Sequence, residues 1–195
     1  HLYMRTPELP PVINRFFIEV ASSCPRNCGL CKNPVIYPCN MCSTVEGTGD
    51  PVLQFSFLSR MLSMDCRNLI VHGGDPCSDI RHLEEIAQYC RSHGYAGNIV
   101  VVTNGDLIDK SMMGCFAKYA LQLLVPVFST VVTNQGEHAH LLQVSKWSAE
   151  YRVSLAVTTV LDANEALAVE QKRIADTLKA WQVFPSIVVQ EDSLD

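Results

Sequence analysis

Six short runs of apolar residues, most of them rich in Val and Ile, recur along the chain of 195 residues. Near-continuous apolar runs of this length are typical of strands that are buried in a parallel sheet. We therefore predict strands over residues 15–21, 68–72, 98–103, 121–129, 152–160 and 184–190.

Segments with the spacing of amphipathic helices lie between several of these runs. Residues 80–93 carry an apolar stripe with a helical period, and Gly94 directly after them is a common helix stop. Residues 165–181 show similar spacing, and residues 52–64 are also predicted to be helical. The chain therefore alternates strands with helices over most of its length.

This alternation predicts an α/β fold with right-handed crossovers and parallel strands. Six strand-helix units fit the chain, whereas a closed eight-stranded barrel usually needs about 250 residues. We therefore predict a partial (β/α)6 barrel as a single domain over residues 1–195, with a doubly wound open sheet as the alternative. Both architectures place the functional site at the carboxyl ends of the strands.

Residues 32–51 interrupt the alternation because they are rich in Pro, Asn, Gly and Cys. A long segment of this kind between a strand and a helix is typical of a functional loop. We expect a Cys-rich insertion there. The chain ends a few residues after the sixth predicted strand, so a further C-terminal domain could lie outside this sequence.

Composition argues against several classes of partner. The formal net charge is -5 and no run of Lys or Arg is present, so no basic patch for nucleic acid or anionic lipid is expected. The longest apolar runs are far shorter than the about 20 residues that span a bilayer. The first residues lack the order of a secretion signal. We therefore expect a soluble cytoplasmic protein without a nucleic-acid or membrane partner.

The distribution of cysteines is uneven. Five of the nine cysteines fall between Cys24 and Cys42. An odd number with one dense group favours a metal site over a disulfide framework, which is the alternative. Thiolate ligands need a reducing compartment, and this again favours the cytoplasm.

Three of these cysteines, Cys24, Cys28 and Cys31, form a CxxxCxxC motif directly after the first predicted strand. Three thiolates on a short loop can bind three irons of a 4Fe-4S cluster and leave the fourth iron open to a ligand. The alternative is a structural zinc site completed by Cys39, Cys42 or a histidine. Cys39 and Cys42 also form a CxxC pair, which could hold an auxiliary metal, act as a redox pair or remain two free thiols.

The CxxxCxxC motif and its position resemble the radical SAM superfamily, which carries this spacing on the loop after the first strand of a partial barrel. The segment His72-Gly73-Gly74-Asp75-Pro76 follows the second predicted strand and is similar to the family's GGEP motif, with Asp in place of Glu. In the family this motif engages the methionine amino group of S-adenosylmethionine. Thr103-Asn104-Gly105 closes the third predicted strand, as TNG often does in the peptide-modifying and activating branches. The resemblance covers about the whole chain.

The resemblance implies two cofactors, a 4Fe-4S cluster and S-adenosylmethionine. An electron from the reduced cluster would break a carbon-sulfur bond and give a 5'-deoxyadenosyl radical, which would abstract hydrogen from a substrate. Leu30 stands where the family commonly has an aromatic residue and would pack on adenine, while Ser129, Thr158 and Thr159 would contact the carboxylate or ribose. The full set of implied cofactor-binding residues is Leu30, Gly73, Gly74, Asp75, Pro76, Thr103, Asn104, Ser129 and Thr158.

The resemblance also implies partners, namely a peptide or protein substrate and an electron donor such as flavodoxin or ferredoxin. One alternative is a radical SAM enzyme that acts on a small molecule or installs a glycyl radical on a partner enzyme. An alternative of another class is an iron-sulfur electron carrier or a zinc-binding module without catalysis. The GGDP segment favours the enzyme, because a carrier needs no amino-group site beside its cluster. The oligomeric state is not predicted.

Several other polar residues have less specific interpretations. Glu19 lies inside the first predicted strand and would either face the barrel lumen or be exposed at an edge. His138 and His140 are expected to be solvated residues at a helix start, although peptide-modifying relatives often carry a His there. Buried packing roles are expected for three cysteines: Cys77, Cys90 and Cys115.

Overall fold

A computed structural model describes residues 12–21, 24, 51–128, 135–161 and 184–189. These residues contain six strands, and each overlaps a predicted one. The first three strands end beside the sequence motifs. The bounds of all strands except β1 and β2 agree with the predicted bounds to within two residues at each end. The strands are β1 (Val12–Ala21), β2 (Asp65–Gly73), β3 (Asn98–Val102), β4 (Leu121–Phe128), β5 (Ser154–Leu161) and β6 (Phe184–Val189).

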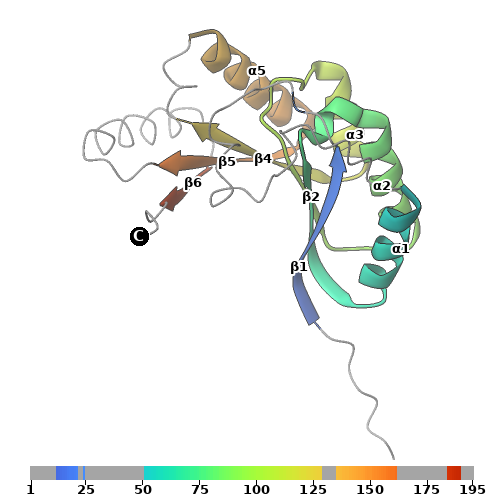
Figure 1. Ribbon diagram of the computed structural model, residues 1–195. Coiled ribbons are helices and arrows are strands. Elements are labelled where there is room, and N and C mark those ends of the chain that lie inside the picture. The colour runs from blue at the N-terminus through green and yellow to red at the C-terminus, as the bar shows by residue number, and fades with distance from the viewer. Residues whose placement is uncertain (1–11, 22–23, 25–50, 129–134, 162–183, 190–195) are drawn as a thin grey trace, which may run out of the picture.

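The strands form one parallel sheet in the order β1-β2-β3-β4-β5-β6. Each strand therefore lies beside its neighbour in the sequence, as in a barrel, whereas a doubly wound sheet reverses its strand order part-way. The predicted α/β partial barrel is confirmed. Figure 1 shows α1, α2 and α3 along one side of β1 and β2.

In the described residues, helices alternate with the strands along the chain. Those predicted over residues 52–64 and 80–93 are confirmed with ends within two residues, whereas the predicted helix at 165–181 and the loop at 32–51 lie outside the described residues. Asp79 caps α2 by accepting a hydrogen bond from the His82 amide. The helices are α1 (Pro51–Leu62), the short 3-10 helix η3 (Pro76–Asp79), α2 (Ile80–Ser92), α3 (Lys110–Lys118) and α5 (Gln135–Tyr151).

The two faces of the sheet differ in burial. Alternate strand residues such as Leu69, Ile99 and Val101 are fully buried in one cluster with helix residues such as Leu83 and Phe116. The intervening residues point to the opposite face, which we call the inner face. Apart from the buried Pro126, they are only half-buried or exposed, and Phe17 is 59% exposed. Within the described residues, the fully buried strand residues therefore gather mainly on one face. Inner-face residues of β1 to β4 include Phe17, Ile70, Val100, Val102 and Leu124.

A row of side-chain amides crosses the amino-terminal ends of β1 to β4. Asn68 donates to the carbonyl of Asn14 at 2.9 Å, Asn98 donates to the side-chain oxygen of Asn68 at 2.9 Å, and Gln122 donates to that of Asn98 at 3.0 Å. These bonds tie neighbouring strands together at the end opposite to the sequence motifs. In the described part of the chain, no helix is both long and apolar enough to cross a membrane.

The difference between the two faces predicts different responses to one substitution on one strand. We expect Val101→Ala to lower the free energy of unfolding by about 2 kcal/mol, because it removes two fully buried methyl groups and leaves a cavity. We expect Val100→Ala, on the inner face, to lower it by less than about 1 kcal/mol. Equilibrium urea denaturation measures both, and equal losses would contradict this assignment of the faces.

Candidate active site

Three sequence motifs meet at the carboxyl ends of β1, β2 and β3. Cys24 follows β1, Gly73 to Pro76 follow β2, and Thr103 to Gly105 follow β3. Because these strands are parallel and adjacent, their ends lie at the same edge of the sheet. The side-chain nitrogen of Asn104 donates to the sulfur of Cys24 at 3.4 Å. The first and third motifs are therefore in direct contact.

The carboxylate of Asp75 joins the second motif to the third. One oxygen accepts from the backbone amide of Cys77 at 2.9 Å and from the Thr103 hydroxyl at 2.8 Å. The other accepts from the backbone amide of Asn104 at 3.1 Å. Asp75 is fully buried, and burial raises the pKa of its carboxyl, while the hydrogen bonds oppose that shift. The side chain is thus engaged in holding two turns together.

The sequence explains why Asp75 takes this conformation. It is the N-cap of η3, followed at once by Pro76, and Asp is a favoured N-cap residue while Pro suits the first helical position. Its oxygen accepts from the amide two residues along the chain, a bond that a short acidic side chain makes readily. Thr103 adds a second brace, since its hydroxyl also accepts from the Gly105 amide at 3.1 Å.

Gly73 and Gly74 are half-exposed, whereas Asp75, Pro76 and Cys77 are buried. Gly73 has φ 145°, a conformation that other residues rarely adopt. Two residues without side chains leave the backbone open to close approach by a ligand. Within this motif, the accessible surface therefore comes from the glycine backbone and not from the acidic side chain.

Asn104 uses both ends of its amide. Its oxygen accepts from the Asp106 amide at 2.8 Å, which leaves its nitrogen directed at Cys24. On the other side of the turn, His140 of α5 lies with its Nε2 atom 3.0 Å from the Gly105 carbonyl oxygen, so this nitrogen is the donor. His140 is half-buried within α5, and the prediction of a solvated residue is wrong for it. The side chain of His138 lies outside the described residues.

The inner face near these turns carries two ionisable groups. Glu19 of β1 and His72 of β2 are register partners, and the ring of Phe17 meets that of His72 edge-on at 5.9 Å. Burial raises the pKa of Glu19 and lowers the pKa of His72, so burial favours the uncharged form of each. Glu19 is half-buried on the inner face of β1, which is the first strand of the sheet.

No disulfide joins the described cysteines, and their environments differ. Burial raises the pKa of Cys77 to about 12 and those of Cys90 and Cys115 to about 11, which disfavours the thiolate form needed for metal binding. Packing roles are confirmed for Cys77 and Cys90, which are buried, while Cys115 is half-buried. Cys24 differs from them because it lies at the strand ends beside a side-chain donor.

Several predicted site residues have side chains outside the described part of the chain. Among the described residues, no group of three or more His, Cys, Asp or Glu could hold a metal ion. Of the three cysteines of the CxxxCxxC motif, Cys24 is the one that lies within the described residues. The side chains that lie outside the described residues are those of Cys28, Leu30, Cys31, Cys39, Cys42, Ser129, Thr158 and Thr159.

Comparison with known proteins gives structural matches only. No protein-family model matches the chain, and no curated protein does. Structures of anSMEcpe, an anaerobic sulfatase-maturating radical SAM enzyme, are similar to it. The structure with bound AdoMet has a TM-score of 0.71 at 19% identity, and the match covers 94% of this chain and 51% of that one. The structure with AdoMet and Cp18Cys peptide has a TM-score of 0.70 at 18% identity, covering 95% and 54%.

A third structure, of native anSMEcpe with AdoMet and Kp18Cys peptide, also has a TM-score of 0.70 at 18% identity, and that match covers 95% of this chain and 53% of that one. The chain thus spans about half the length of these proteins. At this level of identity the match concerns the fold. By its fold, the chain is therefore similar to radical SAM enzymes.

Proposed function

We propose that this chain is the core of a radical SAM enzyme that binds a 4Fe-4S cluster through Cys24, Cys28 and Cys31. When bound and reduced, the cluster would supply the electron that cleaves S-adenosylmethionine to methionine and a 5'-deoxyadenosyl radical. The observation that carries the proposal is the hydrogen bond from Asn104 to the sulfur of Cys24, together with the Asp75 carboxylate that ties the GGDP turn to the same segment. A structural zinc site would have no need of this second turn.

Each described residue has a distinct role in this proposal. Asn104 orients Cys24, and its N–H donated to sulfur would tune the potential of the cluster. The backbone of Gly73 and Gly74 would accept the methionine amino group. Asp75 and Thr103 act as positioning residues, since their polar atoms are already bonded to one another and to the turns. Leu30, Ser129 and Thr158 would contact the adenine, carboxylate or ribose.

The inner face suits a reactive radical. Apolar side chains such as Val102 and Leu124 would exclude water from the space next to the strand ends, and radical chemistry requires that competing hydrogen donors be kept away. Glu19 and His72 are polar groups of this face, where burial raises the pKa of Glu19 and lowers that of His72, and they would offer hydrogen bonds to a substrate.

We further propose a peptide or protein as substrate. Two of the similar structures hold peptides, and an open partial barrel admits a large substrate. A small electron-transfer protein such as flavodoxin or ferredoxin would reduce the cluster, and a cytoplasmic location suits its thiolates. Cys39 and Cys42 are candidates for an auxiliary metal site. A small-molecule substrate, or the activation of a glycyl-radical enzyme, is the second possibility, and we propose no nucleic-acid partner.

The first test is cleavage of S-adenosylmethionine. After anaerobic reconstitution with iron and sulfide and reduction with dithionite, we expect the wild-type chain to form 5'-deoxyadenosine. We expect Cys28→Ala to form none above background, because two thiolates do not retain the cluster. Cys115→Ala is the matched control, since Cys115 is a half-buried helix residue that the proposal does not use, and it should behave as wild type. Chromatography of the quenched reaction measures the product.

Two outcomes would contradict the proposal. A wild-type protein that carries a full, reducible cluster and yet forms no 5'-deoxyadenosine would be an electron carrier. Tight binding of zinc in place of iron would indicate a structural module.

A second prediction concerns the two aspartates of the turn before α2. In Asp75→Asn only one oxygen remains, so either the Cys77 amide or the Asn104 amide loses its buried acceptor. We expect a loss of about 2 kcal/mol in the free energy of unfolding, and much slower cleavage of S-adenosylmethionine. Asp79→Asn is the matched control, because Asp79 is exposed and Asn caps a helix about as well as Asp. Equal effects of the two substitutions in urea denaturation would refute this role of Asp75.

A further inference from the structure

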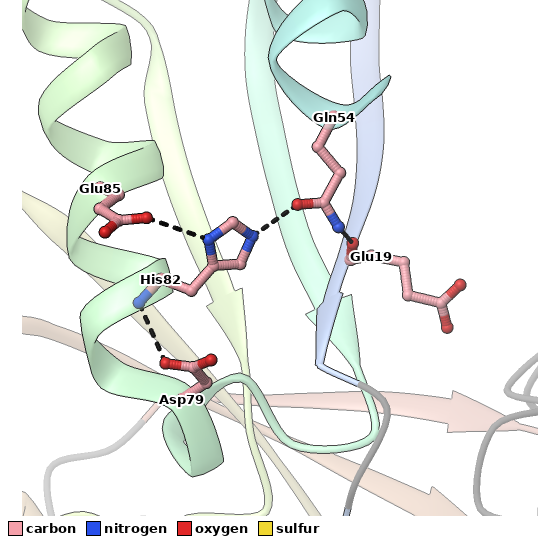
Figure 2. Close-up of polar contacts among 5 residues, drawn as sticks. All are labelled: Glu19, Gln54, Asp79, His82 and Glu85. Atoms are coloured by element: carbon pink, nitrogen blue, oxygen red, sulfur yellow. Dashed lines mark hydrogen bonds and ion pairs between the residues drawn. The ribbon is translucent and has the colours of Figure 1, made fainter. Parts of the chain in front are cut away.

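A chain of side-chain contacts runs from α2 through α1 to the end of β1, and Figure 2 shows its members. The Nδ1 atom of His82 lies 3.3 Å from a carboxylate oxygen of Glu85, and its Nε2 atom contacts the side-chain oxygen of Gln54. The side-chain nitrogen of Gln54 in turn donates to the backbone carbonyl of Glu19. The backbone amide of His82 is itself held by Asp79 at 3.1 Å.

The direction of each bond in this chain follows from its end point. The carbonyl of Glu19 can only accept, so Gln54 presents its NH2 group there and its oxygen to His82. His82 therefore donates from Nε2. Its Nδ1 lies 3.3 Å from a carboxylate oxygen of Glu85, which is an acceptor. The edge of the ring also packs against Phe55 at 6.4 Å between ring centres.

Gln54 is a buried polar residue without a role in the proposed reaction. Its side chain is on α1 and only 7% of the residue is exposed. Burial of an amide is unfavourable unless its hydrogen bonds are made. Both groups of this amide are bonded, one to β1 and the other to α2. Gln54 thus joins three elements, α1, α2 and β1, and the end of β1 leads to Cys24.

The hydrogen bond from Gln54 to the Glu19 carbonyl lies where the pairing of β1 with β2 becomes irregular. The pairing of β1 with β2 shifts register between Glu19 and Ala21, and β1 is an edge strand with one neighbour. A bulge bends a strand and redirects the chain that follows, and bulges are frequent next to active sites. Cys24 comes three residues after the strand ends. The Gln54 side chain therefore supports β1 at the position where its regular ladder fails and the cysteine motif begins.

We propose that Gln54, held by His82, is a positioning residue that fixes the bulged end of β1 and the direction in which the chain enters the Cys24 loop. The purpose of this arrangement rests on the proposed function of Cys24. The positioning itself concerns the fold alone, so the two can be tested separately.

The test uses Gln54→Glu in the full chain, because a carboxylate has nearly the same shape but no hydrogen to donate to the Glu19 carbonyl. Hydrogen-deuterium exchange, followed by mass spectrometry of peptides, is compared between the end and the beginning of β1, before and after cluster reconstitution. We expect about fivefold faster exchange at the end of β1 only. Gln122→Glu is the matched control, since Gln122 makes a similar amide bond at the opposite end of the sheet, and it should leave the end of β1 unchanged.

Two further measurements separate positioning from a general loss of stability. Lower pH should restore slow exchange in Gln54→Glu, since a protonated carboxyl again donates a hydrogen. The ratio of the exchange rates at the two ends of β1 is compared, because the intrinsic pH dependence of exchange cancels in that ratio. His82→Phe keeps the ring contact with Phe55 but frees Gln54, so we expect a smaller effect in the same direction. The double variant should exchange no faster at the end of β1 than Gln54→Glu alone, because the two side chains act through the same series of hydrogen bonds.

The possible results are distinct. Uniform exchange changes throughout β1, or none in either variant, would overturn the inference, even if the wild type forms 5'-deoxyadenosine. Faster exchange confined to the end of β1 would support it, even if the wild type proves to bind zinc. If Gln54→Glu does not fold, the result for His82→Phe decides. In an active enzyme we also expect Gln54→Glu to form 5'-deoxyadenosine about fivefold more slowly per cluster, with Gln122→Glu unaffected.

Discussion

The candidate site depends on one buried carboxylate. Asp75 has no exposure to solvent, and both of its oxygens accept hydrogen bonds from groups that belong to two different strand ends. Such a group is unfavourable in the interior unless all its partners are in place. The turn after β2 and the turn after β3 must therefore form together. Asn104 belongs to the second of these turns, so the position of its amide against Cys24 follows from the same constraint.

The two faces of the sheet contribute differently to stability. The face under the helices carries the fully buried residues and hence most of the hydrophobic stabilisation, whereas the inner face leaves Phe17 more than half exposed. The amide row ties the amino-terminal strand ends through side chains, and the carboxyl ends are tied through Asp75, Gln54 and His140. Stability is thus obtained largely without filling the inner face.

Much of this architecture follows from the sequence, because long apolar runs and amphipathic stripes report directly on burial. The six strands and helices α1 and α2 were predictable in this way. Helix α3 has nine residues, too few for a clear period, and its main signal is the capping Asp109. The extra length of β2 at its start was hidden because Asp65 and Arg67 are exposed strand residues that interrupt the apolar run.

The chemistry of the site was less predictable than its location. The resemblance to the radical SAM family, with each segment following a predicted strand, indicated that Cys24, the GGDP segment and the TNG segment belong together, and the contacts among Cys24, Asp75 and Asn104 agree. It did not indicate that the Asp75 side chain faces inward, since that depends on donors 28 and 29 residues away in the sequence. Gln54 and His140 act through single long-range bonds to backbone carbonyls, and such bonds leave no pattern in one sequence.

The replacement of Glu by Asp in the GGDP segment can be understood from these contacts. A side chain one methylene longer would extend past the amide of Cys77, where Asp75 closes a tight turn and caps η3. The shorter Asp75 side chain does not extend as far as Glu would, but the Thr103 hydroxyl and the Asn104 amide lie close enough to donate hydrogen bonds to its carboxylate. In this chain the acidic residue and the TNG segment therefore form one unit. Changing Asp75 alone to Glu would therefore disturb the third motif as well as the second, although their residues are far apart in the sequence.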